Sequence, residues 1–95
     1  MRVEWTVPAR GDLDEIVAFI GADNRSAAGR VIAAIEGATR RLRRLPRLGR
    51  PGRRPGTREL VVAGTRYTIV YRVGPDAVQV LRVLHHARQF PPAAR

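Results

Sequence analysis

The sequence predicts an α+β fold: an N-terminal strand, two antiparallel helices and a three-stranded meander, with the helices packed on one face of a small, mainly antiparallel sheet. Three observations support this prediction. They are a short alternating run at the start, two stretches with helical spacing of apolar residues, and three strand-like runs separated by turn residues. The chain has 95 residues, enough for one hydrophobic core. We therefore expect a single domain over residues 1–95.

The first two elements follow from the spacing of apolar residues. In residues 2–7 the apolar side chains of Val3, Trp5 and Val7 alternate with polar ones, which indicates a short strand. Pro8 then opens a helix. Within it, apolar residues recur at i, i+3, i+4 and i+7, so that one stripe can face a core. This stripe contains Leu13, Ile16, Val17 and Ile20.

A second helix follows a break at Asn24. Ser26 is the residue type expected at its N-cap, and Pro46 is expected to end it. A few residues between the two helices predict an antiparallel pair. The apolar stripe of the second helix contains Ala28, Val31, Ile32, Ile35, Ala38, Leu42 and Leu45.

The second half of the chain begins with a loop and continues as strands. Residues 46–57 contain three prolines and three glycines, which predicts an irregular segment. Three runs with strand character follow, at residues 58–63, 66–73 and 77–85. The turn residues at 63–65 and 74–76 connect them as hairpins, which completes the meander.

The middle strand of the meander has two distinct faces. Tyr67 and Tyr71 share the face expected to be buried, while Arg66 and Arg72 share the other. The face taken by Arg82 depends on how many residues the turn at 74–76 loops out. We expect three, which places Arg82 on the arginine face, because a turn one residue shorter would bury Arg82 without a visible acidic partner.

The net charge of +10 arises from arginine alone, since the chain has no lysine. Half of the 18 arginines lie between residues 40 and 58, and no acid lies between Glu36 and Glu59. The run continues past the second helix, so compensation of the helix dipole does not explain it. It predicts a surface for an anionic partner. The candidate anion-binding residues are Arg40, Arg43, Arg44, Arg47, Arg50, Arg53 and Arg54.

Several other classes of protein are disfavoured. There is no cysteine, and the carboxylates lack a recognisable ligand spacing, while His85 and His86 would point to opposite faces of a continuing strand. We therefore expect no metal site and no cofactor. No apolar run approaches the roughly 20 residues of a membrane span, and the N-terminus lacks the apolar centre of a signal peptide. We expect a cytoplasmic protein.

One kind of catalysis remains open, namely RNA cleavage without a metal. It requires a base for the 2′-hydroxyl, an acid for the leaving oxygen and a cation for the phosphate. Glu59, His85 and His86 are the candidate proton carriers. The candidate cations are Arg58, Arg66, Arg82 and Arg88. The alternative is structural: Glu59 pairs with an arginine, and His85 caps the edge of the sheet.

Five stretches of the sequence are informative together, in the order DLDEIVAFI, AAGRVIAAIE, GTRELVV, YTIVYRV and VLRVLHHARQFP. With this order and spacing they resemble the RelE/ParE superfamily of toxins from bacterial toxin–antitoxin systems. The positions that carry the family signature are Arg58, Glu59, Tyr67, Tyr71, Arg82 and His85. The resemblance implies a compact α+β toxin that inhibits growth. It also implies a ParD-like or RelB-like antitoxin that wraps the toxin in a hetero-oligomer.

The resemblance also bears on the target. RNA-cleaving relatives, similar to RelE or YoeB, usually have an arginine where this chain has Thr68, and a tyrosine near the C-terminus where it has Phe90. The ending that contains Arg82 and His85 looks like that of ParE-type toxins, which poison DNA gyrase by contact rather than by catalysis. We therefore expect gyrase as the target. Two alternatives stay open: a ribosome-dependent messenger RNA endonuclease, and a non-toxic basic module that binds nucleic acid.

Overall fold

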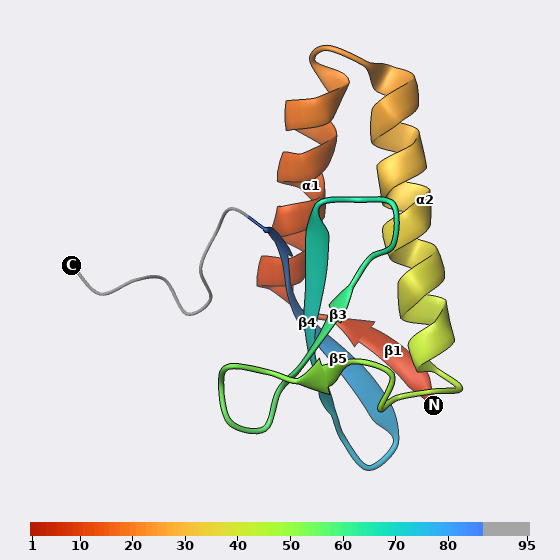
Figure 1. The fold of residues 1–95 in the computed structure, drawn as a ribbon, viewed down its shortest axis with the longest axis vertical. Helices are drawn as coiled ribbons and strands as arrows, with labels where there is room; N and C mark the ends of the chain where they lie inside the picture. The colour runs from red at the N-terminus through yellow and green to blue at the C-terminus, as the bar shows by residue number, and fades with distance from the viewer. Residues whose placement is uncertain (87–95) are drawn as a thin grey trace, which may run out of the picture.

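The computed structural model describes residues 1–86 and has the predicted α+β architecture (Figure 1). Two helices lie side by side and a five-stranded sheet lies against them. The elements in chain order are β1 (Arg2–Trp5), α1 (Val7–Gly21), α2 (Arg25–Leu42), β2 (Arg50–Pro51), β3 (Arg58–Val61), β4 (Tyr67–Val73) and β5 (Ala77–His85). Neither helix of residues 1–86 is long and apolar enough to span a lipid bilayer.

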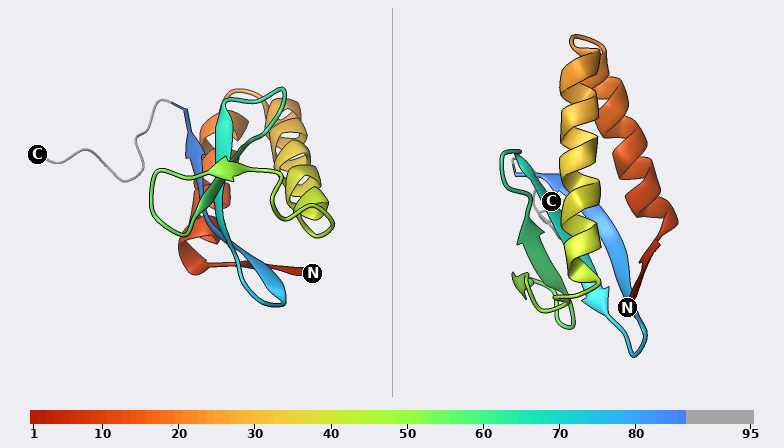
Figure 2. Two further views of the ribbon diagram at one scale, coloured as in Figure 1. Left: turned by 60° about the horizontal axis from the view of Figure 1, so that its bottom comes forward. Right: turned by 90° about the vertical axis from the view of Figure 1, so that its right-hand side faces the viewer.

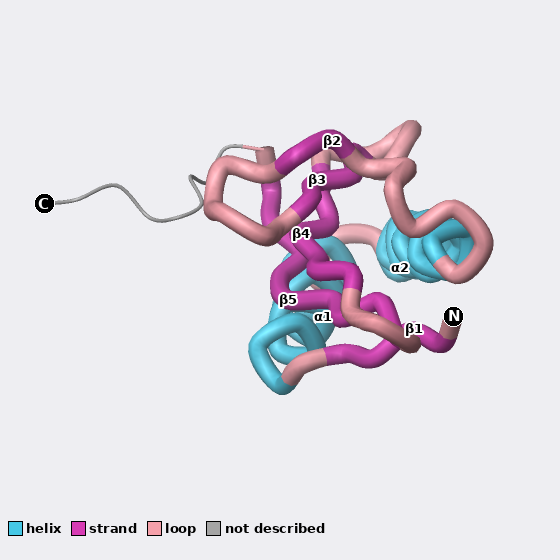
Figure 3. The backbone as a smooth tube through the Cα atoms, turned by 90° about the horizontal axis from the view of Figure 1, so that it is seen from below, coloured by secondary structure: helices cyan, strands magenta, loops and turns pink. Residues whose placement is uncertain are grey.

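The sheet has the strand order β1-β5-β4-β3-β2 (Figure 3). The last three strands form the predicted antiparallel meander, and β2 adds to it in antiparallel fashion. Only β1, which pairs with β5, is parallel to its neighbour in this sheet. The sheet is therefore mainly antiparallel, as predicted. The first and last strands of the chain, β1 and β5, are neighbours in it.

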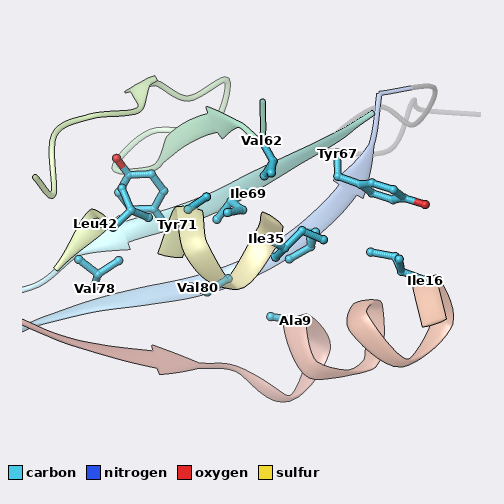
Figure 4. Packing of buried hydrophobic residues seen from close by; sticks show 12 residues of the cluster. Ala9, Ile16, Ile35, Leu42, Val62, Tyr67, Ile69, Tyr71, Val78 and Val80 are labelled. Atoms are coloured by element: carbon cyan, nitrogen blue, oxygen red, sulfur yellow. The ribbon is translucent and has the colours of Figure 1, made fainter. Parts of the chain in front are cut away.

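Both helices cover the same face of the sheet, and their connected ends project beyond it (Figure 2). The core lies in this interface (Figure 4). Ile35 and Leu42 of α2 and Ile69, Tyr71 and Val80 of the sheet are all fully buried. Tyr67 is buried with them, which confirms the prediction that the tyrosine face of β4 is the core face.

The boundaries of α2 differ from the prediction. Asn24, not Ser26, is the N-cap, because its side chain accepts a hydrogen bond from the backbone N–H of Ala27 at 2.9 Å. The helix ends at Leu42, before Pro46 is reached, and tighter turns follow. Leu45 is 56% exposed and does not belong to the buried stripe.

α1 begins one residue before Pro8. Thr6 is its N-cap, and the Thr6 hydroxyl accepts from the N–H of Ala9 and donates to the carbonyl of Leu81 in β5. This residue therefore joins the end of β1 to the start of α1 and to the neighbouring strand. The predicted stripe is only partly right, since Val17 is 47% exposed.

The segment at 46–57 is irregular as predicted, apart from the two residues of β2, and it is fixed to the sheet through Tyr71. The Tyr71 hydroxyl accepts from the N–H of Gly49 at 2.8 Å and donates to the carbonyl of Pro46 at 2.7 Å. A Cβ at Gly49 would lie 2.8 Å from both the Tyr71 hydroxyl and the Glu59 carbonyl. Glycine is therefore required where the loop crosses the sheet.

The register between β4 and β5 corrects the prediction. Val73 pairs with Val78, so the turn is longer than expected, and Val78 and Val80 lie on the core face. A β-bulge then changes the parity, and Arg82 pairs with Val70 on the opposite face. Arg82 thus takes the expected face, but through a bulge that the alternation does not reveal. The strand expected at 58–63 ends earlier, at Val61.

Candidate functional site

The face of the sheet that the helices leave uncovered carries a hollow of about 320 Å³. β3, β4 and β5 supply its floor, and the loop before β3 supplies its rim. The lining includes Arg50, Arg53, Glu59, Thr68, His85 and His86. The structure thus brings together the three candidate proton carriers, Glu59, His85 and His86, although they come from distant parts of the chain.

Glu59 is held firmly in this hollow. Its side chain is 2% exposed. Its Oε2 accepts a hydrogen bond from the Arg53 backbone N–H at 3.0 Å and another from Arg53 Nε at 3.3 Å. The Arg50 guanidinium lies 3.6 Å from Oε1. The structural alternative for Glu59, pairing with an arginine, is therefore confirmed.

These contacts set the charge of Glu59. Burial alone raises the pKa of its carboxyl, but the hydrogen bonds from Arg53 and the two guanidinium charges outweigh burial, and the pKa lies below its ordinary value. A carboxylate with a lowered pKa is ionised at neutral pH and is a weak proton acceptor.

His85 and His86 lie where β5 ends. The His85 ring packs edge-on against Tyr67, with ring centroids 5.3 Å apart, and its centroid lies 6.5 Å from that of His86. The two rings were expected on opposite faces of a continuing strand, yet both line the hollow, because the strand stops at His85. Within residues 1–86, no group of three or more histidines and carboxylates is placed to hold a metal ion.

Two of the four arginines proposed to assist catalysis, Arg58 and Arg82, make contacts away from the hollow. Arg58 donates to the carbonyl of Gly49 at 2.7 Å and so supports the loop. Arg82 donates through Nε and a terminal nitrogen to the two carboxylate oxygens of Asp12, at 2.8 and 2.9 Å. The hydrogen bond with Asp12 raises the pKa of the Arg82 guanidinium. Arg66, the third candidate, is exposed and does not line the hollow. Arg88, the fourth, and Phe90 lie outside the described residues.

Asp12 is the acidic partner that the sequence interpretation missed. It lies on α1 and is 6% exposed. Helical spacing contained the signal, because Asp12 is three residues after Ala9 and four before Ile16, both of which are buried in the core. Asp12 therefore belongs to the buried face of α1, where a carboxylate requires a partner.

The candidate anion-binding arginines are distributed over several hollows. Arg50 and Arg53 surround Glu59, whereas Arg40 and Arg43 lie between α2 and β1. Arg44 lies beside Met1, and Arg47 lies near the turn that joins β4 and β5. Arg54 belongs to the exposed part of the loop. These residues remain predicted contacts for an anionic partner.

A second hollow, of about 380 Å³, lies on the helix side of the same sheet end and is mostly apolar. We call it the α1 groove. Phe19 is its most prominent residue, with 77% of its surface exposed. The groove is lined by Asp12, Glu15, Ile16, Phe19, Tyr67, Val83 and His85. A large exposed aromatic beside buried apolar residues is typical of a surface that binds a protein.

A family model described as the ParE toxin of the type II toxin-antitoxin system parDE matches residues 3–90. The chain belongs to the ParE toxin family. A protein of Sinorhizobium fredii named "Putative toxin Y4kP" is 47% identical over 90 residues, which is 95% of this chain and 93% of that protein. Membership of this toxin–antitoxin family confirms the resemblance seen in the sequence.

Solved structures of toxin–antitoxin proteins share the fold of this chain. The RelBE2 toxin-antitoxin complex of Mycobacterium tuberculosis contains a chain with 34% identity and a TM-score of 0.63, covering 88% of this chain and 95% of that one. The chromosomal ParDE system of P. aeruginosa gives a TM-score of 0.69 at 24% identity, with 90% and 95% covered, which shows the shared fold.

Proposed function

We propose that this ParE-family toxin inhibits DNA gyrase by protein–protein contact and that a cognate antitoxin neutralises it in a hetero-oligomer. Membership of a type II toxin family supports the toxin role. Similar chains occur in complexes described as toxin–antitoxin systems, which supports the antitoxin partner. The face of the sheet that would have to cleave RNA bears on the mode of action.

The single observation that carries the gyrase proposal is the state of Glu59. Its carboxylate is occupied by Arg53 and lies beside Arg50, and its pKa is lowered. A general base works best when its pKa lies near the operating pH. In addition, Arg58 and Arg82 are committed to Gly49 and Asp12 rather than to the hollow. These interactions within the toxin support inhibition by binding to a target protein rather than by cleavage of RNA.

RNA cleavage on the ribosome is the second candidate, and one observation favours it. Glu59, His85 and His86 line one hollow together with Arg50 and Arg53. A histidine can serve as base or acid near neutral pH, and two guanidinium groups can stabilise a phosphate. On this alternative the histidines, rather than Glu59, would move the protons.

The α1 groove is the proposed site for the apolar anchors of the antitoxin. An antitoxin segment would insert apolar side chains beside Phe19, either as a helix in the groove or as an added strand. Acidic side chains of the same segment would meet the basic helix end and loop. The proposed contacts for them are Arg44, Arg47, Arg50, Arg53 and Arg54, while Arg40 and Arg43, which line a different hollow, remain predicted contacts for an anionic partner.

Phe19→Ser tests this docking site. We expect it to weaken antitoxin binding by about tenfold or more, because a central aromatic anchor is lost. The matched control is Val7→Ser, since Val7 is 82% exposed but lies outside the groove. Isothermal titration calorimetry with the antitoxin encoded beside this toxin gives both affinities. Equal affinities for the two variants would remove the groove from the interface.

Expression of the toxin without its antitoxin tests the choice of target. We expect a DNA damage response and broken chromosomes, with messenger RNA intact in the first minutes. Sequencing of transcript ends, followed alongside chromosome integrity, separates the alternatives. Early site-specific transcript cleavage with intact chromosomes would show that the toxin acts on RNA.

A further inference from the structure

A third hollow, which lies away from both sites described above, is strongly basic. It has a volume of about 580 Å³ and lies between β1, the start of α1 and the second half of α2. We call it the β1–α2 groove. Its lining includes Trp5, Arg10, Leu13, Glu36, Arg40 and Arg43. A hollow of this volume is within the range that small ligands occupy.

The arginines of this groove converge from different elements and are incompletely neutralised. The side chains of Arg10 and Arg40 make no ion pair and no hydrogen bond within residues 1–86. Among the described residues, the Arg43 side chain donates only to the carbonyl of Met1, at 3.3 Å. Arg2, which also lines the groove, is already paired with Glu4 and Asp76. Three guanidinium groups therefore remain available to an anion.

Helix stability explains the position of Arg40, which lies in the last turn of α2, but not that of Arg10. Arg10 lies near the N-terminus of α1, where the helix dipole disfavours a cation. Glu36 is four residues before Arg40 on α2, a spacing that suits an ion pair, yet the two side chains do not pair. The groove thus keeps both a cluster of cations and a separate carboxylate available.

We propose that the β1–α2 groove binds a ribonucleotide unit, either as a free nucleotide or as part of an RNA strand. The guanidinium groups of Arg10, Arg40 and Arg43 would bind the phosphate, which arginine holds through paired N–H donors. The half-buried Trp5 and Leu13 would contact the base. The Glu36 carboxylate would accept hydrogen bonds from ribose hydroxyls or from the amino group of a base.

Glu36 distinguishes this ligand from an acidic peptide. A carboxylate within the groove repels the aspartate and glutamate side chains that such a peptide would bring. A nucleotide instead combines one anionic group with hydroxyl and amino donors. It therefore satisfies the arginines and Glu36 together, and this binding function goes beyond the proposed action on gyrase.

Trp5 makes the test direct, because it is the only tryptophan of the chain and it lines the groove. We would titrate the full 95-residue chain with adenosine monophosphate and with a short oligoribonucleotide while recording tryptophan fluorescence. We expect saturable quenching that weakens as salt rises. Saturation by the mononucleotide identifies a free nucleotide as sufficient, and saturation by the oligonucleotide alone identifies an RNA strand.

The decisive comparison uses two variants with the same net charge. The double variant Arg10→Ala/Arg40→Ala should bind about tenfold more weakly or worse, whereas Arg25→Ala/Arg30→Ala, at exposed positions of α2 outside the groove, should bind as the parent does. All four positions are exposed, so folding should be retained, and circular dichroism checks this. The Arg10→Ala and Arg40→Ala single variants give independent readings.

Three results would overturn the proposal. They are fluorescence that neither ligand changes, equal loss of binding in the two double variants, and tighter binding by a glutamate-rich peptide than by either nucleotide ligand. The second result would indicate nonspecific attraction by the net charge. The third would assign the groove to an acidic protein segment.

Discussion

At the scale of single residues, Asp12 links α1 to β5 through Arg82, which lies 70 positions later in the sequence. Its carboxylate accepts two hydrogen bonds from the Arg82 side chain and a third from the Val83 backbone N–H, at 2.8 Å. β1 has ended at this point, so the outer edge of β5 would otherwise carry an unpaired N–H group. Asp12 therefore completes the hydrogen bonding of β5 where the neighbouring strand is missing.

Asp12→Asn should destabilise the fold by about 2–3 kcal/mol, because Arg82 loses its counter-charge in a largely buried position. The matched control is Asp14→Asn on the exposed part of the same helix, which should change stability by about 0.5 kcal/mol or less. Urea unfolding at pH 7 measures both. Equal stability of the two variants would contradict the role given to Asp12.

Glu59 predicts a dependence of stability on pH. Its pKa in the folded state is lowered below the ordinary value of 4.5, so its contribution is fully present above that value. The contribution is lost as the pH falls through the folded-state pKa. Glu59→Gln should therefore cost about 1–3 kcal/mol at pH 7 and progressively less below the ordinary value.

Denaturant unfolding of the parent and of Glu59→Gln, repeated at several acidic pH values, checks this prediction. The difference in the free energy of unfolding should shrink toward low pH. A constant difference across the series would mean that the pKa of Glu59 is not lowered by folding.

The ion pairs of Glu59 and Asp12 differ in how far the sequence could predict them. That Glu59 pairs with an arginine was one of two interpretations, and local charge favoured it because arginines surround it in the chain. The Asp12–Arg82 pair was missed because it depends on a bulge in β5 and on the position of α1 at the sheet edge. Neither is visible in the alternation of apolar residues.

At the scale of elements, the ends of α2 distinguish local from tertiary control. Two residues near its start, Asn24 and Ser26, are both common N-caps. The structure selects Asn24, because the helix begins at Arg25. Asn24 is the N-cap because the short connection after α1 ends there. The N-cap preferences of the two residue types do not specify where this connection ends.

Asn24→Ala should therefore cost about 1 kcal/mol of stability, while Ser26→Ala should have little effect. Thermal unfolding followed by circular dichroism compares the two. A larger loss of stability in Ser26→Ala than in Asn24→Ala would show that Ser26 is the N-cap, as the sequence predicted.

The strands were predicted with unequal success for a physical reason. β5 has the predicted bounds because its apolar run is long and ends in polar residues. β2 was not predicted, because Arg50 and Pro51 show neither alternation nor β-propensity. They form a strand because the loop brings them beside Glu59 and Arg58 of β3. The β4–β5 register depends on the length of the turn and on a β-bulge. The alternation of apolar residues specifies neither, so the register could not be predicted.

At the scale of the whole molecule, the fold separates surfaces of different chemistry. The uncovered face of the sheet carries Glu59 with the two histidines, the α1 groove presents Phe19, and the β1–α2 groove gathers several arginines. Composition predicted an anionic partner and the resemblance predicted the family. The division of the arginines among separate hollows follows from tertiary packing: α2 and β1 enclose one group, and the loop at 46–57 places another over the sheet.

The proposed action of this ParE-family toxin on gyrase is a direct contact between two proteins. The most direct measurement combines the purified toxin with purified DNA gyrase and relaxed plasmid, and follows supercoiling and DNA cleavage on gels. We predict that the toxin blocks supercoiling, and that folded Glu59→Gln does so equally well, because action by contact needs no catalytic base. Unchanged gyrase activity, together with cleavage of ribosome-bound messenger RNA by the same preparation, would contradict the account.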